Sequence, residues 1–89
     1  MKIIAAAINF YPVDSEYPQI ACGKRHGDAF EIMYNHGIAY DKKTAVQGFL
    51  TDDFRFVDRY EAKKIAVEAN QLITPIEETY AALYSEDVW

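Results

Sequence analysis

The chain has 89 residues, 51% of them apolar, and a formal net charge of −5 at pH 7. This length predicts one domain, residues 1–89, with a modest core, and the composition is that of a globular chain. The acidic charge argues against a broad basic face for duplex nucleic acid, because such binding depends on neutralising many phosphates. No stretch approaches the roughly 20 apolar residues that span a bilayer, so no membrane partner is expected.

The first half predicts two strands and a helix. Residues 2–11 are rich in β-formers, and their apolar pattern is continuous rather than strictly alternating, as in a strand that is buried on both faces. A loop with two prolines, residues 12–18, leads to a second strand over residues 19–23. Residues 23–28 then turn into a helix of about ten residues, which Gly37 ends.

The second half contains a strand–turn–strand–helix unit. Two short strands over residues 45–50 and 54–57 flank a turn made of Thr and Asp. Asp58 has the side chain to cap the helix that follows, and Glu61 stands at the spacing of a capping box. Small apolar side chains from Ala62 to Ala69 recur at helical spacing and predict a helix that lies close on the sheet.

The helix is expected to end at Asn70, which tolerates a left-handed backbone, and Pro75 enforces the break. The conformation of residues 76–89 stays open between a short helix at 77–83 and irregular chain, with Trp89 expected to be buried. The order β-β-α-β-β-α predicts an α+β fold, with an antiparallel or mixed sheet of about four strands and two helices packed on one face.

Composition also bears on assembly, compartment and metals. Seven tyrosines and five phenylalanines exceed what so small an interior holds, which predicts a homodimer or higher homo-oligomer. The single cysteine, Cys22, cannot form an internal disulfide, so a reducing cytosol is expected. The two histidines, His26 and His36, lack the spacing of metal ligands, so no metal or other cofactor is expected.

Two groups of cationic residues are candidates for holding an anion. Arg25 and His26 precede the first helix, where free backbone amides also favour an anion, although they are equally typical of solvated charge before a helix. Arg55, Asp58 and Arg59 surround the start of the second helix, and the planar guanidinium of arginine suits phosphate or carboxylate. The alternative for these arginines is an intramolecular salt bridge to acids of the C-terminal segment.

The C-terminal segment offers the polar run Ser85, Glu86 and Asp87, which either caps a final turn, pairs with the arginines or accepts ribose hydroxyls. Aromatic side chains at strand spacing are typical of a core, but three are candidates for stacking on a base: Phe49, Phe54 and Tyr84. The sequence shows no catalytic triad of a nucleophile, a base and a residue that orients the base. It also has no Walker loop and no G-x-G-x-x-G, so an enzyme is not expected.

Five blocks of the sequence, in this order, are similar to those of a group of short bacteriophage and prophage proteins: Gly-Lys-Arg-His-x-Asp at 23–28, Gln-Gly-Phe-Leu-Thr at 47–51, Arg-Phe-Val-Asp-Arg-x-Glu-Ala at 55–62, Ala-Asn-Gln at 69–71 and Leu-Tyr-Ser-Glu-Asp-Val-Trp at 83–89. The group resembles the phage sponges that defeat Thoeris immunity by sequestering cyclic ADP-ribose signals. The resemblance implies a sheet decorated by two helices, assembly as dimers or larger, and ligand pockets near the protomer interface.

By position, the resemblance carries ligand contacts to eight residues: Arg25, His26, Phe54, Arg55, Asp58, Arg59, Ser85 and Asp87. It implies that the arginines hold a pyrophosphate, that a ring stacks on adenine and that Asp87 accepts a hydrogen bond from a ribose hydroxyl. The chain departs from the group's pattern at three positions. Phe54 and Asn70 each stand where the group often has Gly, and Gly27 stands where a second His is common.

The resulting prediction is a phage anti-defence protein in the host bacterial cytosol. It would bind a small nucleotide second messenger, a cyclic ADP-ribose isomer or a cyclic oligonucleotide, and sequester it without turnover. Two alternatives remain. One is a protein-binding inhibitor of a host enzyme, for which an acidic and tyrosine-rich surface is suited. The other is a small nucleotide hydrolase.

Overall fold

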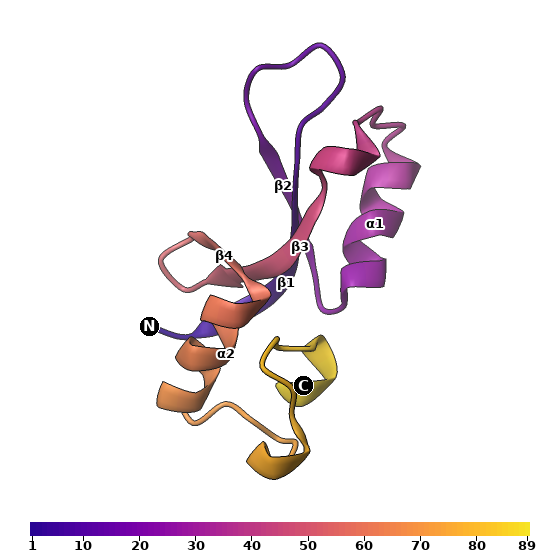
Figure 1. The fold of residues 1–89 in the computed structure, drawn as a ribbon. Helices are drawn as coiled ribbons and strands as arrows, with labels where there is room; N and C mark the ends of the chain where they lie inside the picture. The colour runs from indigo at the N-terminus through magenta and orange to yellow at the C-terminus, as the bar shows by residue number, and fades with distance from the viewer.

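Four antiparallel strands form one sheet in the order β2-β1-β3-β4 (Figure 1) in the computed structural model, which describes residues 1–89. The strands are β1 (Ile3–Phe10), β2 (Gln19–Gly23), β3 (Val46–Thr51) and β4 (Phe56–Asp58), and the helices are α1 (His26–Asn35) and α2 (Arg59–Glu68). The predicted α+β fold with a four-stranded sheet is confirmed, and the sheet is antiparallel throughout.

Both helices pack on the same face of the sheet. Along β1 that face carries Ala6, Ile8 and Phe10, and all three are buried. Ala6 belongs to a core cluster beneath α2, whereas Ile8 and Phe10 belong to a second cluster beneath α1. The helices therefore lie on one face of the sheet toward opposite ends of the molecule, each above its own half of the core (Figure 1).

The opposite face of the sheet is open. Ile20 and Val46, which flank Asn9 on that face, remain more than two-fifths exposed, and neither helix reaches them. The prediction that β1 is buried on both faces is therefore correct only in part, since Ala7 is buried there but Ile4 is exposed. Cys22 also lies on this face, and its partial burial raises the pKa of the thiol.

Local sequence signals determine where the two helices begin and end. Asp58 caps α2, because its carboxylate accepts a hydrogen bond from the Glu61 amide at 2.8 Å. Asn70 ends α2 in the left-handed conformation at φ 56°, and Gly37 does the same after α1 at φ 63°. Lys63 of α2 contacts the C-terminal segment, because its ammonium donates to the Thr79 hydroxyl at 2.6 Å.

The turn between β3 and β4 is built around Thr51. The Thr51 carbonyl accepts from the Phe54 amide at 2.9 Å, and its hydroxyl donates to the Asp53 carboxylate. That hydrogen bond, with the charge of Arg55, lowers the pKa of the Asp53 carboxyl. Phe54 lies in the left-handed region at φ 63°, so β4 begins two residues later than predicted.

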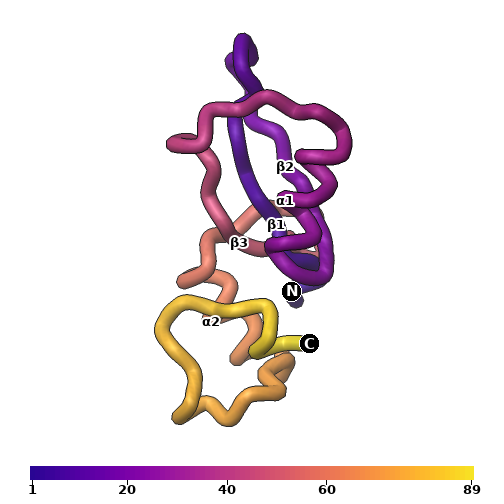
Figure 2. The backbone as a smooth tube through the Cα atoms, turned by 90° about the vertical axis from the view of Figure 1, so that its right-hand side faces the viewer, coloured from indigo at the N-terminus to yellow at the C-terminus, as the bar shows by residue number.

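Three short 3-10 helices complete the chain: Lys42–Thr44, Ile76–Glu78 and Ser85–Asp87. The segment over residues 79–84 is irregular, so the short helix considered for 77–83 does not form. Leu83 and Val88 nevertheless enter the core beneath α2, and Trp89 is half-buried. The molecule is elongated, 42 × 20 × 20 Å, with α1 toward one end and α2 and the C-terminal segment toward the other (Figure 2).

Candidate functional site

The register of the sheet brings the first turns of both helices together. Gly23 at the end of β2 lies opposite Ala6, Ala6 lies opposite Phe49, and Phe49 lies opposite Val57 near the end of β4. The two edge strands therefore leave the sheet at the same row of residues. Since α1 follows β2 and α2 follows β4, both helices begin beside that row.

A pocket of about 250 Å³ lies between these helix starts and the C-terminal segment. We call it the arginine pocket. Its lining consists of Arg25, His26, Gly27, Gln47, Arg59, Tyr84, Ser85 and Glu86. Four of the eight residues predicted as ligand contacts thus meet in one place: Arg25, His26, Arg59 and Ser85.

Arg25 connects α1 to the C-terminal segment. Its Nη1 donates to Ser85 Oγ at 3.3 Å and lies 3.5 Å from Glu86 Oε1. The ion pair is weak because the side chain of Glu86 is largely exposed to water. An anion entering the pocket can therefore take the place of the Glu86 carboxylate.

His26 is held by the sheet beneath it. Its Nε2 lies 2.7 Å from the Gly48 carbonyl oxygen, and because a carbonyl only accepts, this nitrogen carries the hydrogen. The ring also packs edge-to-face on Phe49, with 5.0 Å between centroids. His26 therefore forms a fixed floor of the pocket, with its second ring nitrogen left for another partner.

Arg59 is the most constrained cation of the pocket. Its Nε donates to the Leu83 carbonyl oxygen at 3.0 Å, and its guanidinium carbon lies 4.2 Å from the centroid of the Tyr84 ring. Its Nη2 is buried and has no hydrogen-bond partner. A buried donor without a partner is unfavourable by roughly 1–3 kcal/mol, so the guanidinium of Arg59 is incompletely satisfied within the folded chain.

The C-terminal segment forms the remaining wall of the pocket. Asp87 is buried, and its carboxylate accepts from the Tyr84 amide at 3.0 Å, which shapes the turn that presents Tyr84 and Ser85. The Asp87 carbonyl accepts from the Ile73 amide, and the Trp89 indole donates to the Lys24 carbonyl. Asp87 therefore stabilises the wall and does not line the pocket. This role matches the alternative that the polar run 85–87 caps a final turn.

Asp58 lies beside the arginine pocket. It lines an adjoining open hollow of about 440 Å³, together with Tyr60 and Val46. Gln47 and Arg59 line both hollows, so the two are neighbours at these residues.

The other two predicted contacts, Phe54 and Arg55, lie in the β3–β4 turn and line none of the pockets. Arg55 pairs with Asp53 at 3.4 Å, not with the tail acids. Gln47 was not among the predicted contacts. The sequence contains a signal that could have identified Gln47. It is a polar side chain two residues before the buried Phe49 and therefore on the same face of the strand.

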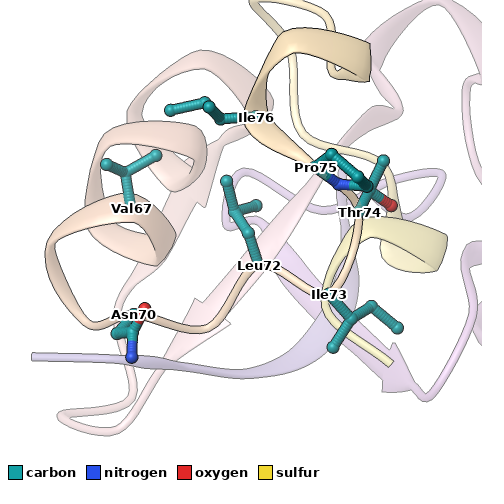
Figure 3. A pocket seen from close by; sticks show the side chains of 7 residues that line it. All are labelled: Val67, Asn70, Leu72, Ile73, Thr74, Pro75 and Ile76. Carbon is teal, nitrogen blue, oxygen red and sulfur yellow. The ribbon is translucent and has the colours of Figure 1, made fainter.

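A separate pocket of about 340 Å³ lies at the C-terminal end of α2 (Figure 3). Val67, Leu72 and Ile76 point toward one another around it, and Asn70 stands at its edge. We call it the apolar pocket. Its lining carries no charged side chain.

The structure holds no group of three metal-ligating side chains, and none of its helices has the length and apolar character needed to cross a membrane. Fold and site together define a small α+β protein with a cationic pocket at the starts of its two helices. The chain belongs to a family of phage proteins, since the model of the family described as "Phage T4 y16D protein" matches residues 2–89. No curated protein and no solved structure matches the chain.

Proposed function

We propose that this phage protein binds a cyclic nucleotide immune signal of its host and sequesters it without turnover. The signal would be a cyclic ADP-ribose isomer, as in the Thoeris system, or a cyclic oligonucleotide. The protein would act in the bacterial cytosol as a homodimer or larger homo-oligomer, and its effect would be anti-defence.

The observation that carries the proposal is the presence of two arginines, Arg25 and Arg59, in the lining of one pocket, where the buried Nη2 of Arg59 has no hydrogen-bond partner. A turn of the planar guanidinium would bring this donor to a phosphate oxygen, which supplies the acceptor that it lacks. Arg25 adds a second positive charge to the same pocket. In a chain of net charge −5, this arrangement favours one small anion over an extended polyanion.

The dimensions of the site also favour a nucleotide over a bare phosphate. The arginine pocket and the hollow beside Tyr60 are neighbours that share Gln47 and Arg59 in their linings. The anionic part of a ligand would lie against Arg25 and Arg59, with a base or ribose in the adjoining hollow. There Gln47 offers an amide and Tyr60 an exposed ring.

Ligand release tests the proposal. Purified protein is mixed with each candidate messenger, free ligand is removed by filtration, and the protein is heated. Mass spectrometry then identifies what returns to solution. Intact messenger, recovered near one equivalent per pocket, is the expected result. A chemically altered product would show turnover, and recovery of no messenger from the whole panel would refute the proposal.

A matched pair of variants assigns the binding to the pocket. Arg25→Gln removes one positive charge inside the arginine pocket, and Lys42→Gln removes one at an exposed position outside it. Arg25→Gln should reduce the recovered messenger at least about tenfold, because it removes a charge-assisted hydrogen bond donor. Equal losses in both variants would mean that net charge, not the pocket, retains the ligand.

A further inference from the structure

Phe54 combines two features that the folded chain itself does not use. Its backbone lies in the left-handed region at φ 63°, and its side chain is 76% exposed. A bulky residue rarely adopts this conformation, and a glycine would fit the same turn without strain. The strained backbone holds an aromatic ring out from the molecule, where it contacts water.

The apolar pocket is the complementary feature. It measures about 340 Å³ and is lined at its centre by Val67, Leu72 and Ile76 (Figure 3). Benzene occupies an enclosed apolar cavity of roughly 150 Å³, so the volume of this open pocket is sufficient for a phenylalanine ring. Nothing in the chain fills it, and exposed apolar surface of this kind is typical of an interaction site.

The turn that carries Phe54 is connected by hydrogen bonds to the segment that lines the pocket. Asp52, in the β3–β4 turn, accepts from the Lys2 amide at 3.1 Å. The next residue, Ile3, exchanges two hydrogen bonds of 2.8 Å with the Gln71 side chain. Gln71 in turn lies between two lining residues of the pocket, Asn70 and Leu72. Figure 1 accordingly draws the β3–β4 turn, the N-terminus and α2 on one side of the molecule.

The turn of Phe54 carries one cation, Arg55, and two carboxylates, Asp52 and Asp53, whereas the charged residues that directly follow two lining residues of the pocket are acidic. Beside Phe54 stands Arg55, whose pairing with Asp53 is exposed and therefore exchangeable. Beside the pocket stand Glu68, which follows Val67, and Glu77, which follows Ile76, and both are exposed. Arg55 of one copy would thus meet carboxylates of another copy, which favours a second copy of this chain as the partner.

We infer that two copies associate through a two-fold axis, with Phe54 of each copy inserted into the apolar pocket of the other. Because each copy carries both the ring and the pocket, a two-fold axis allows both contacts to form at once, and the assembly closes as a dimer. The inference rests on the homo-oligomeric part of the proposed function and supplies its interface, which is separate from the arginine pocket.

Sedimentation equilibrium of the full chain, over a roughly 100-fold range of concentration, tests the interface. The native chain should dimerise, and Phe54→Ala should raise the dimer dissociation constant at least about tenfold, as expected when a central aromatic anchor is lost. Tyr34→Ala is the matched control. Tyr34 is 84% exposed on α1, away from the pocket, so its removal should change the dissociation constant less than about twofold. A monomeric native chain, or a Phe54→Ala chain that dimerises normally, overturns the inference.

The pairing of the two features is tested by a double-mutant cycle. Val67→Lys places a charge in the apolar pocket at a partly exposed helical position, so the fold should tolerate it. If Phe54 occupies that pocket, adding Val67→Lys to Phe54→Ala should weaken the dimer little further. Fully additive effects would mean that the two residues act at different contacts.

Charge reversal provides an independent check that does not remove the ring. Arg55→Glu should weaken the dimer, and combining it with Glu77→Arg should restore it. Absence of rescue, together with additivity in the cycle, overturns the proposed arrangement. Ligand release is measured separately, so a monomeric Phe54→Ala chain that retains the messenger upholds both the inference and the proposed function. If the native chain dimerises but no messenger is recovered from it after heating, only the proposed function is refuted.

Discussion

Replacing Arg59 by Met separates the stability of the fold from the binding of a ligand. The substitution removes the buried Nη2 that has no partner, which relieves roughly 1–3 kcal/mol of desolvation. It also removes the charge-assisted hydrogen bond from Nε to the Leu83 carbonyl, roughly 1.5–3 kcal/mol, and the contact with the Tyr84 ring, about 0.5–1 kcal/mol. These effects nearly cancel, and we expect the free energy of unfolding to fall by only about 1 kcal/mol.

Thermal unfolding measured by circular dichroism, with and without the messenger, provides the assay. For a domain of this size, 1 kcal/mol corresponds to roughly 4–8 °C in Tm. The native chain should gain about 2.7 kcal/mol at a ligand concentration of 100 times Kd, a rise of roughly 10–20 °C. The Arg59→Met chain should gain almost nothing at the same concentration, because its pocket lacks the donor that the phosphate satisfies.

Two results would refute this reasoning. A fall of more than about 3 kcal/mol in the free energy of unfolding of the ligand-free variant would mean that the fold itself depends on the Arg59 guanidinium. A full ligand-dependent rise of Tm in Arg59→Met would place the binding site elsewhere. Lys42→Gln serves as the control for the loss of one positive charge, and both its Tm and its ligand response should match those of the native chain.

Three further predictions concern the turn and the sheet. Phe54→Gly should be more stable to urea than Phe54→Ala by about 1 kcal/mol, since only glycine relieves the left-handed strain, and the reverse order would contradict this. Gly48→Ala should lower the free energy of unfolding by more than about 3 kcal/mol, because its Cβ would lie 2.2 Å from the Val57 carbonyl oxygen; a change below about 1 kcal/mol would disprove the close approach. The hydrogen bond from Thr51 lowers the pKa of Asp53, so Asp53 stabilises the fold at neutral pH and this contribution is lost as pH falls below the ordinary carboxyl range. Asp53→Asn should flatten the acid limb of a stability–pH profile, and an unchanged limb would count against it.

Local elements could be predicted from the sequence because their determinants lie within a few residues. The strand at Gln19–Gly23, the cap at Asp58 and the left-handed Asn70 each depend on short-range chemistry, and the structure confirms all three. The C-terminal segment could not be predicted in this way. Its shape depends on hydrogen bonds from Leu83 to Arg59 and from Ile73 to Asp87, and no helical or strand periodicity encodes such contacts.

The candidate site illustrates the same limit. Arg55 and Arg59 are four residues apart and were equivalent as cations in the sequence, but the structure separates them. Arg59 starts α2 and faces the pocket, whereas Arg55 lies in the β3–β4 turn. The left-handed Phe54 delays the start of β4, and this displacement leaves Arg55 outside the sheet. The sequence pattern does not reveal the left-handed backbone at Phe54, because phenylalanine itself favours strands.

The arginine pocket is assembled from residues that are distant along the chain. Arg25 contacts Ser85 across 60 positions, and Arg59 contacts Leu83 across 24. No fragment that lacks residues 84–86 contains the complete pocket, so its formation is coupled to folding of the whole domain. Retained nucleotide would therefore report the native fraction, and its release in denaturant should coincide with the cooperative unfolding transition, without an earlier local step.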